Sequence, residues 1–199
     1  MIENPLAKKL IEHRLILASG SPRRKKFFED LGIEFEIRLH PVDEVYPNDL
    51  KAAEIAIYLA QLKASVFKDT LKTNEILVTS DTVVWHKEQS LAKANNENEA
   101  IEMLTKLSGD WHEVISAVSF TTTQKQKTVS ATTKVKFCPL TREEIRFYVS
   151  KWKPFDKAGA YGIQDWLGAI GIEAIEGSYN NVVGLPTHIV YKTLTAMVD

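Results

Sequence analysis

The 199-residue chain is poor in cysteine, in long apolar runs and in any excess of one charge. Its one cysteine, Cys138, excludes an intramolecular disulfide, and no cluster of Cys and His has the spacing of a zinc site. No apolar run reaches the ~18 residues that a membrane-spanning helix needs. The first residues, MIENPLAKKLIEHR, contain acids and lack the apolar core of a secretory signal. We therefore expect a cytoplasmic protein in which Cys138 is a packed free thiol.

The charges of the chain are nearly balanced, with 25 Lys and Arg against 26 Asp and Glu and a formal net charge of -1. Proteins that bind nucleic acid or membrane surfaces generally carry a basic excess, so this balance disfavours both classes and leaves room only for a local basic patch. Hydrophobic residues make up 44% of the chain, which is enough for a sizeable core. With no internal repeat, low-complexity tract or linker, we expect a single domain over residues 1–199.

Helix and strand signals alternate along the chain. Ser21 is a predicted N-cap with Pro22 at the first helical position, and Thr141 with Glu144 forms a predicted capping box. The resulting order of elements predicts a mixed α/β sheet with helices on its faces. Strands are predicted at 15–19, 35–39, 75–86, 112–123 and 127–140, and helices at 22–31, 50–70, 96–109, 141–152 and 187–198.

Two of these predictions concern the second half of the chain. The long strands at 112–123 and 127–140 are expected to pair antiparallel across the turn QKQ. The stretch 153–186 is glycine-rich, and we expect short strands at most within it. Its glycines suggest backbone that turns sharply or approaches a ligand closely.

The segment LILASGSPRRKKFFEDLG, residues 15–32, places four consecutive cations, Arg23 to Lys26, at the start of a predicted helix. A helix N-terminus already carries positive partial charge and free N–H groups, so the cations repel it. An anion in front of the helix resolves this conflict, and Arg23 and Arg24 have donor geometry that matches phosphate. The alternative is that these side chains are simply solvated. Lys25 and Lys26 are expected to face solvent.

Polar residues in unusual places give further candidates. Asp81 interrupts the β-branched run VTSDTVV, where an unpaired buried carboxylate is costly, so it needs a cation, a metal or a cleft beside it. The alternative is an Asp in a turn beside a short strand. Lys63, Lys93 and Lys157, like Glu44 in the acidic loop, are unremarkable singly and gain meaning only in a shared site.

These residues lie in a series of motifs: LILASGSPRR, VDE, LAQLKA, SDTVV, LAK, LSGDWHEV, DKAGAYGIQ and GSYNNVVGLP. In this order and spacing the chain resembles the Maf family, the septum-formation-inhibitor-like nucleotide pyrophosphatases, over residues 14–198. The resemblance implies an α/β fold with an elongated mixed β-sheet flanked by helices and two lobes around a deep cleft. A homodimer is a further expectation from the resemblance alone.

The resemblance also implies an activity, the hydrolysis of a nucleoside triphosphate between its α and β phosphates to the monophosphate and pyrophosphate. A divalent cation, Mg²⁺ or Mn²⁺, is implied as cofactor. Carried over motif by motif, the implied site consists of Ser21, Arg23, Arg24, Lys63 and Lys93 on the phosphates, Glu44 and Asp81 on the metal, Asp81 as proton acceptor, and Gln164.

The Maf family has branches with different base preferences. The stretches SGSPRR, SDT and GAYGIQ look like the branch that hydrolyses dTTP and UTP, in which Arg23, Thr82 and Gln164 occupy the positions that separate the branches. An amide such as Gln164 can pair with the O2, N3–H and O4 groups of uracil or thymine. One departure is that Ala92 and Ala94 replace the Gly and Pro usually found around the lysine of the GKP-like motif, so the loop that carries Lys93 is less constrained.

Three other functions remain open at this stage. The first is another nucleotide specificity, such as 7-methyl-GTP or a modified purine nucleotide. The second is a nucleotide sensor that regulates cell division without turnover, which the presence of both Glu44 and Asp81 disfavours. The third is a nucleic-acid binder using RRKK, which the balanced charge and the lack of basic stripes with aromatic residues disfavour.

Overall fold

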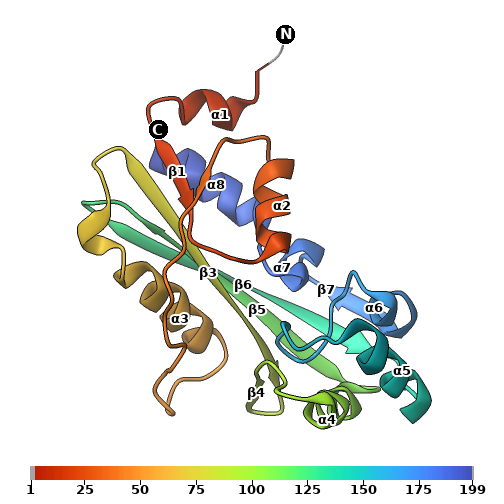
Figure 1. Ribbon diagram of the computed structural model, residues 1–199. Helices are drawn as coiled ribbons and strands as arrows, with labels where there is room; N and C mark the ends of the chain where they lie inside the picture. Colours follow the sequence, from red (N-terminus) through yellow and green to blue (C-terminus); the bar gives the residue numbers. More distant parts are fainter. Residues whose placement is uncertain (1–2, 199) are drawn as a thin grey trace.

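One mixed seven-stranded β-sheet runs through the molecule (Figure 1). The computed structural model describes residues 3–198. The strand order is β2-β1-β3-β5-β6-β7, with β4 paired to β3 beyond the end of β1. Strand β1 is parallel to β2 and β3, and the remaining pairs are antiparallel. The strands are β1 (Arg14–Leu17), β2 (Glu36–Ile37), β3 (Glu75–His86), β4 (Gln89–Leu91), β5 (Trp111–Thr121), β6 (Gln126–Phe137) and β7 (Ile172–Glu176).

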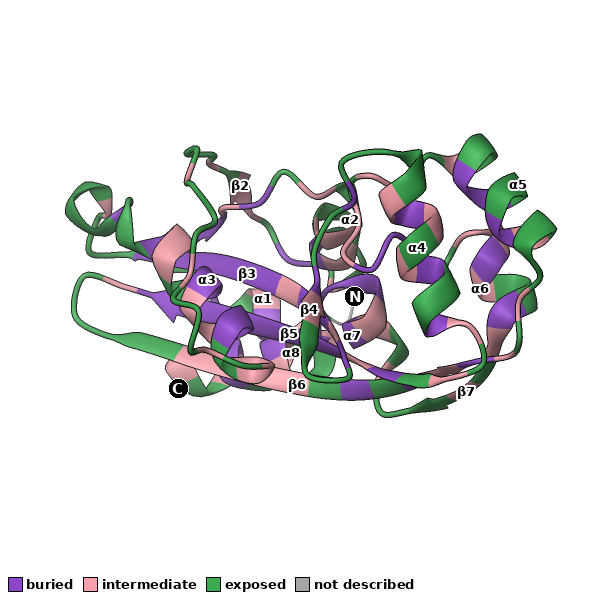
Figure 2. Cartoon of the chain, turned by 90° about the horizontal axis from the view of Figure 1, so that it is seen from below, coloured by how far each residue is buried: buried purple, intermediate pink, exposed green. Residues whose placement is uncertain are grey.

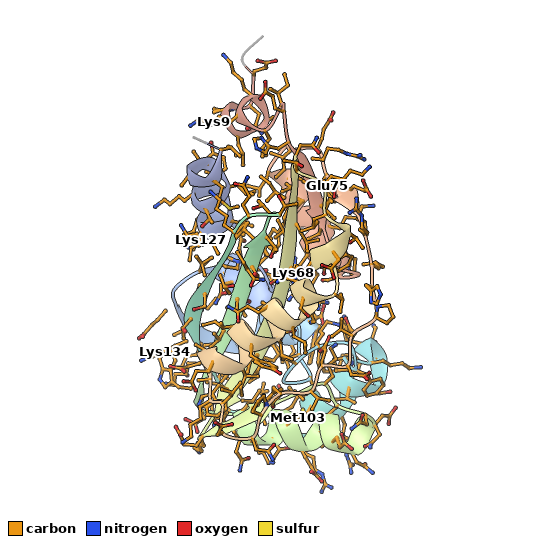
Figure 3. The ribbon with its side chains drawn as sticks, turned by 90° about the vertical axis from the view of Figure 1, so that its left-hand side faces the viewer. Lys9, Lys68, Glu75, Met103, Lys127 and Lys134 are labelled. Carbon is orange, nitrogen blue, oxygen red and sulfur yellow. The ribbon has the colours of Figure 1, made fainter. Side chains whose placement is uncertain are left out.

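The helices cover the two faces of this sheet unequally. Helix α3 lies across one face, where it packs on β3 and β5 (Figure 3). The opposite face carries two groups, α1, α2 and α8 toward one end and α4 to α7 toward the other. The helices are α1 (Pro5–Lys9), α2 (Pro22–Asp30), α3 (Ala53–Ser65), α4 (Glu97–Leu107), α5 (Arg142–Trp152), α6 (Trp166–Gly171), α7 (Tyr179–Val183) and α8 (Thr187–Met197), with a short 3₁₀ turn η1 at Lys68–Thr70.

The two groups of helices bury separate apolar clusters against the same sheet face. Val78 of β3 belongs to the cluster under α1, α2 and α8, whereas Val84 of the same strand belongs to the cluster under α4 and α5. Both clusters depend on the two-residue period of β3, since even-numbered side chains point to one face. Figure 2 shows that β3 and β5 are buried along most of their length. We call these two groups of helices, each with the apolar cluster beneath it, the two lobes. The expected mixed sheet flanked by helices and divided into two lobes is therefore confirmed.

The middle of β3 has a strand partner on one side only. Its residues 75–78 pair with β1 and its residues 84–86 pair with β4, so among the described residues the stretch 79–83 pairs with β5 alone. Asp81 and Thr82 lie in this gap. Because they are consecutive in a strand, their side chains point to opposite faces of the sheet.

Most of the predicted elements are confirmed. The strand 75–86, the antiparallel hairpin, the N-cap Ser21 and the capping box of Thr141 and Glu144 are all present. Within the described residues 3–198, no helix is long and apolar enough to cross a bilayer.

Three predictions of extent were wrong. The strand 35–39 shrinks to two residues, Glu36–Ile37. The helix predicted at 50–70 ends at Ser65, because the chain turns there to bury Phe67 while Val66 faces solvent. The glycine-rich stretch contains the helices α6 and α7 as well as β7; α7 begins where the Ser178 side chain accepts a hydrogen bond from the backbone N–H of Asn181.

Candidate active site

A cavity of about 900 Å³ opens at the gap beside the middle of β3. It lies between the two lobes and reaches both faces of the sheet, since residues from α3 and from the opposite helices line it. Residues from separate parts of the chain therefore meet at one place. Every site residue expected from the sequence lines this cavity: Ser21, Arg23, Arg24, Glu44, Lys63, Asp81, Thr82, Lys93 and Gln164.

Lys63 is the centre of the polar group on the α3 side. Its Nζ lies 2.5 Å from Oδ1 of Asp81 and 2.9 Å from Oε1 of Glu44. Lys93, on the loop after β4, lies 4.0 Å from Oε2 of Glu44. Burial by itself would raise the pKa of Glu44, but the hydrogen bond and charge of Lys63, with Lys93 and Arg24, outweigh it and hold that pKa below its usual value.

Arg24 is the most fully engaged cation of the cavity. Its guanidinium donates to the carbonyl oxygens of Ser80, at 2.9 Å, and Gly184, at 3.0 Å, and to Oγ1 of Thr82, at 3.0 Å. Burial lowers the pKa of Arg24, and the charge of Asp81 partly opposes that effect. Gly184 has φ of +124°, a conformation that L side chains rarely adopt, and its carbonyl oxygen accepts from Nε of Arg24 on α2.

Arg23 reaches across the cavity to the other lobe. Its Nη1 lies 3.1 Å from Oδ2 of Asp156, and Oδ1 of the same carboxylate lies 2.7 Å from Nζ of Lys157. Ser21 remains at the helix N-terminus, where its Oγ accepts from the backbone N–H of Arg24 at 3.4 Å. The phosphate-binding roles of these residues stay predictions. Lys25 and Lys26 are exposed and pair with acids one turn along α2, as expected for solvated residues.

The loop that carries Gln164 is held from behind by Tyr148 of α5. The Tyr148 hydroxyl donates to Oδ2 of Asp165 at 2.7 Å and accepts from the backbone N–H of Gly162 at 3.0 Å. Burial, followed by the hydrogen bond to Asp165, raises the pKa of Tyr148 well above its usual range. Gln164 is itself exposed at the cavity, so its position is set by neighbours that are buried.

Tyr161, three residues before Gln164, also lines the cavity. Tyr161 is buried and its hydroxyl lies 2.7 Å from Nε2 of His112 on β5. Burial lowers the pKa of His112 to about 3, so the imidazole is neutral at physiological pH and accepts or donates without charge. The ring of Phe137 packs edge-on against Tyr161 at 4.9 Å between centroids. Of these three rings, Tyr161 lines the cavity, and His112 and Phe137 are buried behind it.

Several residues that line the cavity or support it from behind were not predicted from the sequence. Asp156 and Asp165 are in or next to the motif DKAGAYGIQ, so the motif itself was an available signal. Tyr148 gave no signal, because it occupies an ordinary apolar position of an amphipathic helix. Ser116 interrupts the apolar strand sequence VISAVSF just as Asp81 interrupts its own strand, and this was a usable signal.

The carboxylates of the cavity form an incomplete set of metal ligands. Within residues 3–198 there is no group of three or more His, Cys, Asp or Glu side chains suited to a metal ion. Glu44 and Asp81 are two hard oxygen ligands brought together around Lys63. Mg²⁺ is commonly held by one or two carboxylates plus substrate phosphates and water, so these two residues fit a cation that arrives with a polyphosphate.

Comparison with known proteins adds independent findings. A family model described as "Maf-like protein" matches residues 14–197. A protein of Christiangramia forsetii named "dTTP/UTP pyrophosphatase" is 54% identical over 190 residues, which cover 96% of this chain and 97% of that protein. One of the same name from Flavobacterium johnsoniae is 51% identical, covering 97% of this chain and 100% of its own length.

A solved structure shares the architecture at much lower identity. The Staphylococcus aureus Ham1 protein superimposes with a TM-score of 0.52 at 16% identity, covering 92% of this chain and 99% of that one. At this identity the likeness concerns the fold alone, and it agrees with a mixed sheet carrying two groups of helices.

Proposed function

Because the chain belongs to the Maf-like protein family, we propose that it hydrolyses dTTP and UTP to the nucleoside monophosphate and pyrophosphate. The relatives named for this reaction, at 54% and 51% identity over nearly the whole chain, support the proposal. The observation that carries it is the convergence of Arg23, Lys63 and Lys93, from three separate elements, on a cavity that also contains Asp81.

The charges of the cavity suit a triphosphate. A nucleoside triphosphate brings about four negative charges, which lysine and arginine side chains bind by charge-assisted hydrogen bonds. Lys63 and Lys93 approach the phosphates from the α3 side, and Arg23 approaches from the N-terminus of α2, where the helix dipole adds positive potential. In the proposed complex the phosphates replace the carboxylate partners that these cations have in the free protein.

Asp81 is proposed as the general base. It is buried beside the cavity, and its Oδ1 contacts Lys63, which also contacts Glu44. Asp81 would orient a water molecule against the α-phosphorus and accept its proton, while the surrounding cations stabilise the pyrophosphate that leaves. A divalent cation held by Glu44 and Asp81, Mg²⁺ or Mn²⁺, would supply charge neutralisation and lower the pKa of bound water.

Base selection is proposed for the opposite side of β3. Thr82, Gln164 and Arg23 line the cavity, as does Tyr161. The amide N–H of Gln164 can donate a hydrogen bond to the O4 carbonyl of uracil or thymine. The proposed substrates include modified pyrimidine nucleotides. We further propose that the protein acts in the cytoplasm and that it assembles as a homodimer.

The experiment is a pyrophosphate-release screen of dTTP, UTP, CTP, GTP and 7-methyl-GTP with Mg²⁺ and with Mn²⁺. The expected result is the fastest release from dTTP and UTP, and release only when a divalent cation is added. Fastest release from 7-methyl-GTP would overturn the proposed specificity. Saturable nucleotide binding with no pyrophosphate released under either cation would overturn the enzymatic function and favour a nucleotide sensor.

A further inference from the structure

A buried row of polar groups runs behind Thr82, away from the cavity. Nη2 of Arg24 lies 3.0 Å from Oγ1 of Thr82, which lies 2.9 Å from Oγ of Ser116, which in turn lies 3.1 Å from the carbonyl oxygen of Asn181. Thr82 and Ser116 are direct partners in the β3–β5 pairing. Ser116 and Asn181 are both fully buried, and neither lines the cavity.

The two ends of this row determine the direction of every hydrogen bond in it. A guanidinium can only donate and a backbone carbonyl can only accept. Arg24 therefore donates to Thr82, Ser116 donates to the Asn181 carbonyl, and Thr82 must donate to Ser116. The row has a single arrangement of hydroxyl hydrogens that satisfies all three contacts.

A second acceptor near Thr82 does not change the outcome. The Gly184 carbonyl lies 3.4 Å from Oγ1 of Thr82, farther than Ser116 Oγ at 2.9 Å. The Gly184 carbonyl also accepts from Nε of Arg24 at 3.0 Å, so Ser116, the nearer acceptor, is the residue that fixes the direction of the Thr82 hydrogen. With one lone pair accepting from Arg24 and the hydrogen donated to Ser116, the hydroxyl of Thr82, which lines the cavity, has one oxygen lone pair and no donor left for a ligand.

The acceptor at the end of the row is itself held in place. The Asn181 side chain donates to the Val114 carbonyl at 2.9 Å and to Oγ1 of Thr133 at 3.0 Å, which ties α7 to β5 and β6. The backbone carbonyl of Asn181 is thus held against Ser116. A rigid acceptor at one end and a buried Arg24 at the other keep the intervening hydroxyls from reorienting.

We propose that Ser116 is a positioning residue for base selection, because it holds the Thr82 hydroxyl as an acceptor toward the nucleobase. This inference rests on the proposed function. Uracil and thymine carry an N3–H donor, which an acceptor at Thr82 satisfies, whereas N3 of cytosine is an acceptor and meets an unpaired lone pair. Leaving buried polar groups unpaired in this way is the strongest form of discrimination that hydrogen bonds provide.

The test is the ratio of kcat/KM for UTP to kcat/KM for CTP. Both substrates use the same phosphate-binding groups, so general damage to the site cancels in the ratio. Ser116→Ala frees the Thr82 hydroxyl to rotate, and we expect the ratio to fall about tenfold, which corresponds to about 1.4 kcal/mol. Thr82→Val, which removes the hydroxyl at nearly constant shape, should lower the ratio as well.

Ser119→Ala is the matched control. Ser119 is also a fully buried serine of β5, and its hydroxyl has a side-chain partner, Oγ1 of Thr128 at 3.1 Å, but it points to the α3 face. Its ratio should equal that of the wild type. A ratio that is unchanged in Ser116→Ala, or changed equally in Ser119→Ala, would overturn the inference.

Two further observations keep the result interpretable. If Ser116→Ala does not fold, Ser116→Cys retains the volume with a weak acceptor and should lower the ratio in the same direction; an unchanged ratio there also overturns the inference. Failure of the inference leaves wild-type pyrophosphate release from UTP intact. Failure of the proposed function is recognised separately, as an absence of release by the wild type from dTTP and UTP.

Discussion

Nζ of Lys63 lies 2.5 Å from Oδ1 of Asp81 and joins helix α3 to the stretch of β3 that pairs with β5 alone. The same ammonium contacts Glu44, so one cation is shared by two carboxylates from a loop and a strand. This arrangement keeps the cavity nearly neutral before a ligand arrives. In the proposed complex, an incoming polyphosphate would compete for Lys63 and release both carboxylates for a cation or a water molecule.

Replacement of the proposed base tests its role most directly. Asp81→Asn is expected to lower kcat for dTTP by ~10²-fold or more with little change in KM, which is the usual scale for loss of an acid–base group. Steady-state pyrophosphate release measures both constants. Asp110→Asn is the control, because Asp110 pairs with Lys87 and His86 away from the cavity. Near-normal turnover in Asp81→Asn would remove this residue from the base role.

Removal of the shared cation is expected to move the acid limb of the pH–rate profile. Lys63 is the main influence that holds the pKa of Glu44 below its usual value against burial. In Lys63→Met that pKa rises, so Glu44 becomes protonated at higher pH and the acid limb of kcat/KM shifts upward. Lys136→Met is the control, since Lys136 pairs with Glu173 outside the cavity. If the acid limb of kcat/KM stays at the same pH in Lys63→Met, ionisation of Glu44 does not control the rate.

The Tyr148 hydroxyl is expected to act on substrate binding more than on chemistry. Tyr148→Phe removes the hydrogen bonds to Asp165 and Gly162, so the loop that presents Gln164 loses its buried anchor. We expect KM for dTTP to rise about tenfold, in line with the loss of one or two buried hydrogen bonds, while kcat changes much less. Tyr179→Phe changes an exposed tyrosine and should alter neither constant. A fall confined to kcat would contradict this account.

The ion pair at the start of β3 is expected to control stability in acid. Hydrogen bonds from Arg38, against the opposing effect of burial, lower the pKa of Glu75 to about 2. Because the folded-state pKa lies below the unfolded value, this stabilisation is complete above about pH 4.5 and disappears as the pH falls toward 2. It amounts to about 3 kcal/mol at neutral pH.

Urea unfolding as a function of pH measures this effect. Glu75→Gln should lose most of this stability at pH 7 and show a flatter decline between pH 4.5 and 2. Glu36→Gln is the control, because Glu36 shares Arg38 but is 42% exposed, and it should cost much less. Glu75 does not line the cavity, so kcat should be preserved. Equal losses in the two variants would contradict the prediction.

Features that depend on neighbouring residues were predictable from the sequence. Ser21 and Pro22 start α2, and Thr141 and Glu144 start α5, through contacts made within one turn of helix. Asp81 was recognisable because a buried carboxylate in a β-branched run needs a partner. The end of α3 was predicted wrongly because it depends on a distant contact. Phe67 is buried in a separate apolar cluster, and this burial ends the helix before the apolar pattern of the sequence does.

The sequence by itself determined the order of the elements and the caps Ser21 and Thr141, which follow from local geometry, and it marked Asp81 through the cost of burying charge. The other polar residues expected at the cavity came from the resemblance of the motifs to the Maf family. Only the tertiary structure decided how those residues are connected. Arg24 meets Gly184 across 160 positions of the chain, and Ser116 meets Asn181 across 65. Such contacts depend on which strands pair and in which register, and the register places Ser116 opposite Thr82.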